Sequence, residues 1–496
     1  GDAKMKEAAG FFWDVVTKDR SYVIGGNSDG EHFSPKERLS AFLSPTTAET
    51  CNTYNMLKLT RHLFEWDPKV EYADYYERAL YNHILASQNP ETGMMCYYVP
   101  LSSGSSKRYS SPDDSFWCCT GTGVENHSKY GDSIYFHHGA NSLYVNLFIA
   151  STLSWKQRGV VITQHTGFPD ETATHLSFEC RAPERFTLLI RHPSWAGPGF
   201  KIEVNECAGQ ESSRPGSYAE ISRTWRSGDR VDISLPMQLH TEGFKDNPNR
   251  LAFLDGPIVL CAAVSSRRSV PVIVSPENEL LSGVKPEAGQ PLSFNADSSE
   301  FHLEGAARNG NLKMTPFYAM TGHDYAVYYD VLTPAQWRKR EEDNRAELAR
   351  QAEMAAREVD VVTPGDEASE TAHKLAGERT ESGDLDDRQW RDARYGGWFS
   401  YELKVLPGAD QELDCAYWGS DRGRVFDILV DGQQIATQRL DENHPGIFFD
   451  AVYPLPAALL QGKQTVTVRF QARPRGMAGG LFGCRILKKV AAARVP

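Results

Sequence analysis

Long apolar runs and clusters of positive charge are both missing from this sequence of 496 residues. No stretch of about 18 consecutive apolar residues occurs, so the sequence predicts no membrane-spanning helix. The 53 lysine and arginine residues are outnumbered by 65 aspartate and glutamate residues, which gives a formal net charge of −12. Because an acidic surface repels nucleic acid and anionic lipid, we expect neutral small molecules or neutral polymers as ligands.

The motifs of several common enzyme classes are also absent. Gly25-Gly26 does not belong to a Gly-x-Gly-x-x-Gly motif, and no Gly-Lys-Ser/Thr sequence offers a phosphate cradle. No His-Glu-x-x-His helix motif occurs either. The sequence therefore gives no indication of a nucleotide-binding enzyme or a zincin protease.

The first residues show no charged segment followed by an apolar one, so no signal peptide is visible. Instead, the chain starts at Gly1 and enters a helical pattern at once. We therefore expect the parent protein to extend beyond this start, in which case the missing signal does not indicate a compartment.

The nine cysteines are too few, and odd in number, for a disulfide framework in a chain of this length. Four of them lie in strand-like segments and are expected to be small buried apolar residues: Cys180, Cys207, Cys261 and Cys415. The adjacent pair Cys118-Cys119 is different, because neighbouring cysteines rarely form a disulfide without strain. This pair indicates a metal site or a reactive thiol.

Residues 1–138 have the apolar spacing of helices. In Lys4–Lys18 the apolar residues recur every three or four positions, as along the buried face of a helix. The same spacing predicts further helices at Ala48–Trp66, Tyr72–Ser87 and Val124–Phe136. Between them lie the loops 25–45 and 100–123, which are rich in Gly, Ser, Pro and Asp. Loops of that length inside a compact domain are usually functional.

The rest of the chain is mostly β-rich. Alternating apolar segments predict a β-sandwich at 139–265, followed by a smaller β-rich region at 266–336. A charged, alanine-rich stretch begins the segment 337–385, which is predicted to be a helical and polar linker. Residues 386–496 alternate again, as in Gln464–Phe470, and predict a second, jelly-roll-like sandwich that serves as an accessory domain.

Four possible metal ligands fall within the helical part. Glu49 and Cys51 stand at the start of a predicted helix, and Cys118 and Cys119 precede another. One carboxylate with three thiolates completes the tetrahedral shell that zinc prefers. Residues two apart do not share a face of a regular helix, so Glu49 and Cys51 would need a distorted first turn. By spacing alone, the alternative that these cysteines are simply buried thiols stays open.

A possible general acid/base lies upstream, in Gly30-Glu31-His32-Phe33. Glycine beside an acidic residue lets the backbone bend close to a ligand, so Glu31 is a candidate. Taken alone the signal is weak, since most loop glutamates face water. His32 and His127 are candidate ligands or sugar contacts, with the alternative that each is an ordinary hydrogen-bonded polar residue.

Together, these segments resemble glycoside hydrolase families 127 and 146, which contain retaining β-L-arabinofuranosidases. The matching segments are Gly25-Gly26, Gly30-Glu31-His32-Phe33, Glu49-Thr50-Cys51, Phe116-Trp117-Cys118-Cys119, Gly121-Thr122-Gly123 and Glu125-Asn126-His127. The Glu-His-Phe and Phe-Trp-Cys-Cys sequences are closer to family 146. The resemblance implies that Glu49, Cys51, Cys118 and Cys119 bind Zn²⁺. It also implies that Cys118 is the nucleophile and Glu31 the general acid/base.

The resemblance also implies a fold and a substrate. The catalytic domain of these families is an (α/α)6 barrel, and the motifs of this chain match its later half. We therefore expect a multidomain α + β chain, with the C-terminal part of such a barrel at 1–138 followed by β-sandwich domains. The implied activity is exo-hydrolysis of β-L-arabinofuranosyl residues from plant oligo- or polysaccharides, in a periplasmic or secreted protein. The residues that contact the sugar and the oligomeric state are not predicted.

Two other hypotheses remain at this stage. The first is a non-catalytic carbohydrate-binding protein in which a structural zinc site holds the helices together. The second is an inverting glycosidase that uses two carboxylates, Glu31 with Asp113 or Asp114. A position of Glu31 close to Cys118 would favour the thiolate mechanism over both.

Overall fold

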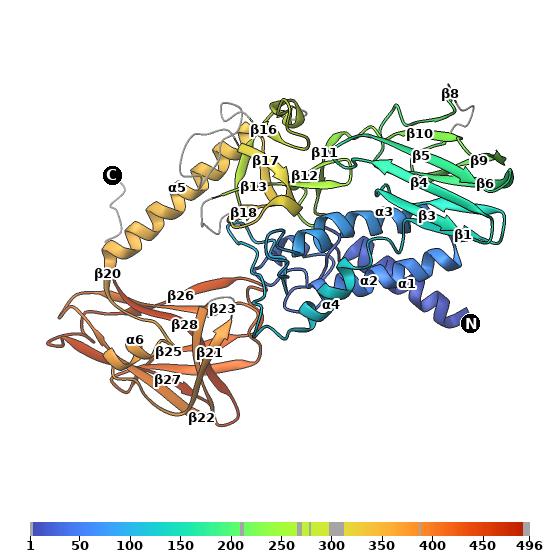
Figure 1. The fold of residues 1–496 in the computed structure, drawn as a ribbon. Helices are drawn as coiled ribbons and strands as arrows, with labels where there is room; N and C mark the ends of the chain where they lie inside the picture. The colour runs from blue at the N-terminus through green and yellow to red at the C-terminus, as the bar shows by residue number, and fades with distance from the viewer. Residues whose placement is uncertain are drawn as a thin grey trace. The chain divides into compact units, whose positions relative to one another are not determined.

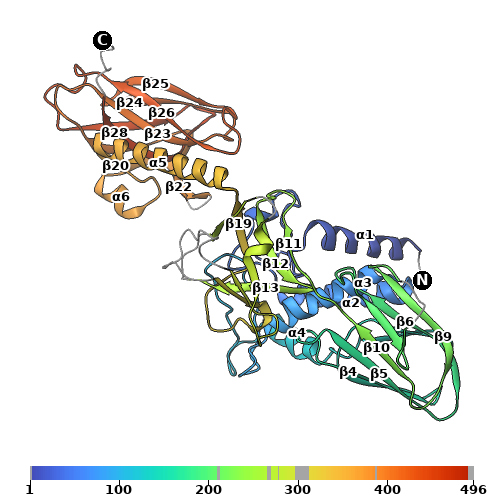
Figure 2. The same ribbon diagram turned by 90° about the horizontal axis from the view of Figure 1, so that it is seen from above.

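A computed structural model describes residues 3–208, 213–264, 270–276, 279–296, 312–385 and 388–489. The chain forms two compact units, Gly1–Arg338 and Lys339–Pro496. Within the described residues, the first unit contains helices α1 to α4, the start of α5 and three sheets, and the second is built around one large sheet (Figures 1 and 2). In the described residues, no helix is long and apolar enough to cross a membrane. The predicted multidomain α + β architecture is therefore confirmed.

The helices of the first unit carry the segments singled out by the sequence. They are α1 (Ala3–Asp19), α2 (Thr50–Trp66), α3 (Val70–Ala79) and α4 (Cys118–His127). After α3 the chain continues through a π-helical turn, Leu80–Ile84, and a 3-10 turn, Leu85–Ser87. The first three helices agree closely with the sequence prediction. Helix α2 packs against α1, α3 and α4, and so forms the centre of this layer.

The prediction of a helix at Val124–Phe136 is wrong. Helix α4 begins at Cys118 and ends at His127, and Tyr135 and Phe136 belong to a strand. Glycines disfavour a helix interior, so Gly121 and Gly123 argued against helix in the sequence. The structure gives a reason for the second glycine: a Cβ on Gly123 would lie 1.8 Å from the sulfur of Met95. Close packing against the segment around Met95 outweighs the low helix propensity.

Two sheets of the first unit form a β-sandwich. The four-stranded sheet has the order β1 (Tyr135–His138), β2 (Ser142–Val145), β6 (Glu184–His192), β9 (Ser217–Trp225). The six-stranded sheet has the order β3 (Ser151–Trp155), β4 (Val160–Thr166), β5 (Ala173–Cys180), β10 (Arg230–Ser234), β7 (Lys201–Val204), β8 (Cys207–Ala208). Their shared core includes Trp225, which stacks on Phe178 at 4.3 Å between ring centroids.

The third sheet lies against the loops that carry the candidate site. Its main order is β14 (Val272–Val274), β19 (Tyr328–Leu332), β12 (Arg250–Asp255), β13 (Ile258–Ala263), β17 (Leu312–Pro316), β16 (Phe294–Ala296), β15 (Val284–Pro286). Strands β11 (Leu239–Gly243) and β18 (Tyr325–Ala326) pair with β12 and β13. Ile24, Ala48 and Val99 are buried in one cluster with Ala252 and Tyr328 of this sheet. The sheet therefore fixes the loops on either side of α2.

A buried charge cluster ties helix α3 to the sandwich. The guanidinium of Arg191 on β6 donates to Asp74 at 2.6 Å and also to Glu77, and Trp195 donates to Glu77 at 2.7 Å. The side chains of Arg191 and Glu77 are almost fully inaccessible to solvent. Because a buried charge is stable only with partners, this cluster fixes the position of α3 relative to β6.

The second unit begins within α5 (Pro334–Arg357), a helix without buried residues. Its sheet has the main order β25 (Gln433–Leu440), β24 (Arg424–Val430), β27 (Thr465–Ala472), β22 (Arg388–Lys404), β28 (Met477–Lys488), β23 (Gln411–Trp418), β26 (Phe448–Leu455). The sheet encloses one apolar core, in which Phe399 stacks on Phe470 at 4.9 Å. The unit is a sandwich-like β-domain, as expected from the alternating sequence.

Residues 358–385 differ from the predicted polar linker. They form β20 (Glu358–Val362), which pairs with β28, a short helix α6 (Glu367–Ala372), and β21 (Ala376–Leu385), which pairs with β22. Strand β21 buries none of its residues, so it has no apolar alternation that a sequence could reveal. Helix α5 corresponds to the helical part of the linker that was predicted at 337–385. The boundaries predicted for the other domains stay predictions.

The expectation that all four isolated cysteines are buried is only half right. Cys261 and Cys415 are buried, as expected for small apolar residues in the middle of a strand. Cys180 is only partly buried because it ends strand β5, and Cys207 is exposed because it lies on the edge strand β8.

We predict that Glu77→Gln lowers the free energy of unfolding of the first unit by about 3–5 kcal/mol, because it leaves the buried Arg191 guanidinium without one of its charged partners. Urea denaturation measures the change. The control Asp343→Asn removes an exposed ion pair on α5 and should change stability by at most about 0.5 kcal/mol. A Glu77→Gln variant as stable as this control would contradict the role given to the cluster.

Candidate metal centre and active site

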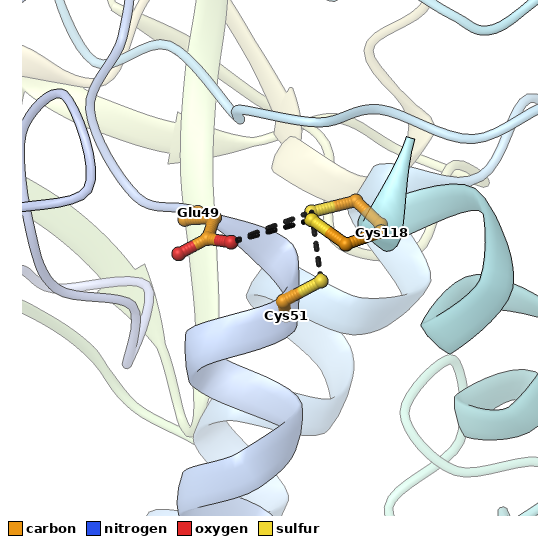
Figure 3. Close-up of side chains that lie close together, drawn as sticks. Glu49, Cys51 and Cys118 are labelled. Atoms are coloured by element: carbon orange, nitrogen blue, oxygen red, sulfur yellow. Dashed lines mark hydrogen bonds between the residues drawn. The ribbon is translucent and has the colours of Figure 1, made fainter. Parts of the chain in front are cut away.

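Glu49, Cys51, Cys118 and Cys119 come together at one point, although 66 residues separate Cys51 from Cys118 in the chain. One ligand atom from each lies within 4.8 Å of the others (Figure 3). Among the described residues, this is the one group of three or more Cys, His, Asp or Glu side chains that meets this condition. The four residues that the sequence singled out as a set are therefore neighbours in space.

The N-termini of two helices build the cluster. Glu49 is the residue before α2 and has extended backbone angles, while Cys51 is the second residue of that helix. Cys118 and Cys119 are the first two residues of α4. The extended backbone at Glu49 lets two residues that are two positions apart reach the same point, which a regular helix would not allow. Helix N-termini also favour anionic groups, and thiolates are more stable there than elsewhere.

The distances within the cluster suit a tetrahedral ion with sulfur ligands. The carboxylate oxygen of Glu49 lies 3.9 Å from the sulfur of Cys118 and 3.8 Å from that of Cys119, and those two sulfurs are 3.9 Å apart. Two sulfurs bound to one tetrahedral zinc ion at about 2.3 Å are separated by about 3.8 Å. The sulfurs of Cys51 and Cys119 are closer, at 3.0 Å, as in a thiol hydrogen bond. The donor set fits a metal ion.

The crowding of four acidic groups shifts their pKa values. Burial, followed by the charge of Glu31, raises the pKa of Glu49, and burial raises the pKa of Cys118. The hydrogen bond with Cys119 lowers the pKa of Cys51 to about 7, while that same contact raises the pKa of Cys119. Three thiols and a carboxyl group cannot all be ionised here unless a cation compensates their charge.

Cys118 differs from the other three ligands in its exposure. Cys119 is fully buried and Cys51 nearly so, whereas Cys118 is exposed. Glu49 is partly buried. The cluster therefore presents one sulfur toward solvent and holds the other two inside the protein.

A tight turn carries Glu31 to the cluster. Gly30 and Glu31 both have positive φ, 53° and 70°, and they connect Asp29 to His32, which form an antiparallel bridge. This left-handed pair of residues is typical of a two-residue hairpin turn. Positive φ is uncommon for a residue other than glycine and costs free energy, so the surrounding structure holds Glu31 in place.

Tyr97 links Glu31 to Cys118. Its hydroxyl donates a hydrogen bond to the carboxylate of Glu31 and lies 3.6 Å from the sulfur of Cys118. The backbone of the same segment is fixed by a hydrogen bond from the amide of Thr50 to the carbonyl of Tyr97, 3.0 Å long. The hydrogen bonds to Glu31 and Cys118 raise the pKa of Tyr97, so the hydroxyl keeps its proton at neutral pH.

No motif in the sequence marks Tyr97 as a site residue. The only available signal was its place in Cys96-Tyr97-Tyr98, a short aromatic segment between two predicted helices. Thr122 was also missed: its hydroxyl lies 3.1 Å from the sulfur of Cys51, from one turn further along α4. Only the three-dimensional arrangement identifies these two residues.

The two histidines do not join the cluster. His32 is exposed on its turn. His127 contacts the Tyr130 hydroxyl through its Nδ1 at 2.6 Å, and burial lowers its pKa to about 4. The exposed loop before α4 carries Asp113 and Asp114, and Asp114 accepts a hydrogen bond from Ser111 of the same loop.

A groove of about 490 Å³ opens beside Tyr97 and Trp117. Trp117 is the residue just before Cys118, so the groove begins next to the exposed sulfur. Its other lining residues are a mixture of aromatic, hydroxyl and charged side chains, among them Tyr98, Ser105, Arg108 and Asp324. Such a lining offers both stacking and hydrogen bonds to a polar ligand.

Comparison with known families places the site in a catalytic domain. Residues 1–132 match the model of the β-L-arabinofuranosidase GH127 catalytic domain, and residues 142–237 match the GH127 middle domain. Residues 353–487 match a family of unknown function. The resemblance to family 146 stays a prediction.

One curated relative is a non-reducing end β-L-arabinofuranosidase from Bifidobacterium longum subsp. longum. It is 24% identical over 288 residues, which are 53% of this chain and 42% of the relative. The chain thus spans less than half of that relative's length.

Two solved structures support the fold. A GH127 β-L-arabinofuranosidase from Geobacillus stearothermophilus T6 has a TM-score of 0.54 and 22% identity, over 67% of this chain and 57% of that one. Another GH127 β-arabinofuranosidase has a TM-score of 0.50 and 20% identity, over 65% and 56% of the two chains. The helices of the first unit are thus part of the helical barrel of this fold, as the sequence predicted. Residues 1–132 and 142–237 are thus similar to the catalytic and middle domains of GH127 β-L-arabinofuranosidases.

Proposed function

We propose that this protein is a retaining exo-glycosidase that removes β-L-arabinofuranosyl residues, with Cys118 as nucleophile and Glu31 as general acid/base. One observation carries the proposal. The exposed sulfur of Cys118 and the carboxylate of Glu31 share the hydroxyl of Tyr97 as a common neighbour. A nucleophile and a proton donor on either side of one glycosidic bond are what retaining hydrolysis requires.

Zn²⁺ is the ion we assign to Glu49, Cys51, Cys118 and Cys119, because three thiolates and one carboxylate form a tetrahedral set that zinc prefers. When bound, zinc keeps the thiols ionised at neutral pH and stabilises a sulfur that leaves carbon.

In the first step, the carboxyl group of Glu31 donates its proton to the glycosidic oxygen, and the sulfur of Cys118 attacks the anomeric carbon. The bond from that carbon to the leaving oxygen breaks as the carbon–sulfur bond forms. The exposure of Cys118 agrees with this role, because its sulfur must reach the substrate.

In the second step, the carboxylate of Glu31 takes a proton from water, and the oxygen of that water attacks the anomeric carbon. The carbon–sulfur bond breaks and returns the electron pair to Cys118. Two successive inversions retain the configuration of the sugar. The Tyr97 hydroxyl hydrogen-bonds the Glu31 carboxylate, and so orients the group that moves the proton in both steps.

The substrates we propose are arabinose-containing plant oligo- and polysaccharides. The groove beside Tyr97 and Trp117 has aromatic and hydroxyl groups suited to the part of the glycan that follows the terminal sugar. Action on such polymers is consistent with a periplasmic or secreted protein, which we propose on the same grounds.

The two other hypotheses are less well supported. A purely structural zinc site would be expected to close all its ligands off from solvent, but Cys118 is exposed. The two-carboxylate mechanism with Asp114 needs that residue to face Glu31, whereas Asp114 accepts a hydrogen bond from Ser111 within its own loop.

We predict that Cys118→Ser and Glu31→Gln each abolish the release of L-arabinose from a synthetic β-L-arabinofuranoside, because each removes a group that makes or breaks a bond. The assay applies to this chain and to any longer form that contains it. The controls Asp113→Asn and Asp114→Asn should remain active. Full activity in Cys118→Ser, or its loss in the aspartate variants, would favour the two-carboxylate mechanism instead.

Elemental analysis should find about one zinc ion per chain, since the donor set is complete for one tetrahedral ion. We expect Cys119→Ser to lose most of this zinc and a chelator to abolish activity. The matched control is Cys207→Ser, which alters an exposed thiol outside the cluster. Equal zinc contents in the two variants would disprove the assigned ligand set.

Tyr97→Phe should reduce kcat by about tenfold to a hundredfold and leave the zinc content unchanged, because the residue orients Glu31 without binding the metal. Tyr109→Phe is the matched control, since its hydroxyl contacts Thr321 instead. If Tyr97→Phe also released zinc, its effect would be on the metal site and the positioning role would be wrong.

A further inference from the structure

The groove of about 490 Å³ adjoins both catalytic groups of the proposed mechanism. Three of the residues that line it are joined to those groups. Trp117 directly precedes Cys118 in the chain. The hydroxyl of Tyr97 contacts both Cys118 and Glu31. The carbonyl of Thr46 accepts a hydrogen bond of 3.1 Å from the amide of the residue before Glu31.

The proposed mechanism places the leaving group on the side of Glu31. When a sulfur nucleophile displaces the leaving oxygen, that oxygen departs opposite the sulfur, where the acid protonates it. The turn that carries Glu31 is also fixed to the edge of the groove, because the carboxylate of Asp29 accepts a hydrogen bond of 3.0 Å from the hydroxyl of Thr46. The groove is therefore a space beside the acid that a leaving group can enter.

One part of the groove is aromatic. The side chain of Trp117 is 40% exposed, and its ring meets that of Tyr97 edge-on, 6.0 Å apart between centroids. Tyr97 packs in turn against Tyr98, at 4.6 Å. These contacts hold the indole of Trp117 in place and leave part of its surface open. Sugar rings have an apolar face of C–H groups, and such a face stacks on an aromatic ring.

Another part of the groove is polar and lies on a fixed segment. Asp324 precedes Tyr325, which forms an antiparallel bridge with Ser105. The hydroxyl of the buried Tyr325 also donates a hydrogen bond of 2.7 Å to the carbonyl of Pro100. Arg108 follows in the same segment and is exposed. Hydroxyl, cationic and anionic side chains thus line the groove on a backbone that the third sheet holds.

The size and charge of the groove suit a neutral sugar. Its volume lies within the range of about 300–1,000 Å³ that is typical of pockets for small ligands. Arg108 and Asp324 contribute one charge of each sign, so a carboxylate on the ligand would be attracted by the first and repelled by the second. Hydroxyl groups, in contrast, accept hydrogen bonds from the guanidinium and donate them to the carboxylate. The lining therefore favours a neutral ring over an anionic one.

We propose that this groove is the subsite for the leaving group, in which Trp117 stacks on a neutral sugar residue and Arg108 and Asp324 bind its hydroxyl groups. The proposal rests on the function proposed above and assigns to Trp117 a role in substrate specificity. The preferred substrates then carry the β-L-arabinofuranosyl residue on another neutral sugar, rather than on a small alcohol or a uronic acid.

The test measures kcat/KM for methyl β-L-arabinofuranoside and for two disaccharides, in which the same residue is linked to L-arabinose or to galacturonic acid. We expect the neutral disaccharide to exceed the methyl glycoside by about tenfold to a hundredfold, because binding of the leaving sugar contributes to transition-state stabilisation. Trp117→Ala should lower this ratio about tenfold, and Trp117→Phe should keep part of it. The matched control Phe116→Ala removes the neighbouring ring, which is 95% exposed and does not line the groove, so the ratio should stay the same.

A second measurement needs no turnover. Isothermal titration calorimetry follows the binding of the neutral disaccharide to Cys118→Ser, and adding Trp117→Ala to that variant should weaken the binding about tenfold. The zinc content of each protein checks that the substitution leaves the metal cluster intact.

The outcomes distinguish this proposal from the function on which it rests. Equal kcat/KM values for the methyl glycoside and the neutral disaccharide would overturn the subsite and leave the proposed hydrolase function intact. A preference for the galacturonic acid disaccharide would also overturn it, and so would an equal loss in Phe116→Ala. Release of arabinose from none of the three substrates would instead overturn the hydrolase function. In that case, disaccharide binding that depends on Trp117 would still support the groove as a sugar site, and binding that does not depend on it would refute this.

Discussion

Mutual repulsion within the cluster of Glu49, Cys51, Cys118 and Cys119 is the constraint on which the first unit depends. Four acidic groups meet at the N-termini of α2 and α4, where helix dipoles favour negative charge but cannot balance it alone. A cation bound here would remove this repulsion and would join two helices that are far apart in the sequence. Helices α2 and α4 contact each other at this cluster. The hydrogen bond from the amide of Thr50 to the carbonyl of Tyr97 lies beside it.

The cluster was predicted from two short motifs and from the family resemblance that they carry. A cysteine pair and a Glu-x-Cys segment at helix starts are visible without a structure, and the resemblance to GH127 and GH146 proteins linked them to Glu31. The β-rich parts were predictable for a similar reason, since core strands such as β27 alternate strictly between buried and exposed residues. A strand that buries only one of its two faces has apolar residues at every second position, and this alternation is visible in the sequence.

Features that depend on contacts between distant segments could not be predicted. Gly123 looks like a helix breaker until Met95 is seen against it. Strand β21 has no buried residue, so its pairing with β22 leaves no apolar signal. Tyr97 lies in a short segment without a motif, and its importance comes from the positions of Glu31 and Cys118, which are distant from it in the chain.

The central claim is that Glu49, Cys51, Cys118 and Cys119 bind one zinc ion. Extended X-ray absorption fine structure at the zinc edge of the purified protein tests it most directly, because the method counts the ligand atoms of the ion without any assumption about activity. The account predicts three sulfur neighbours at about 2.3 Å and one oxygen at about 2.0–2.2 Å. A first shell of nitrogen and oxygen only, or of four sulfurs, would contradict it.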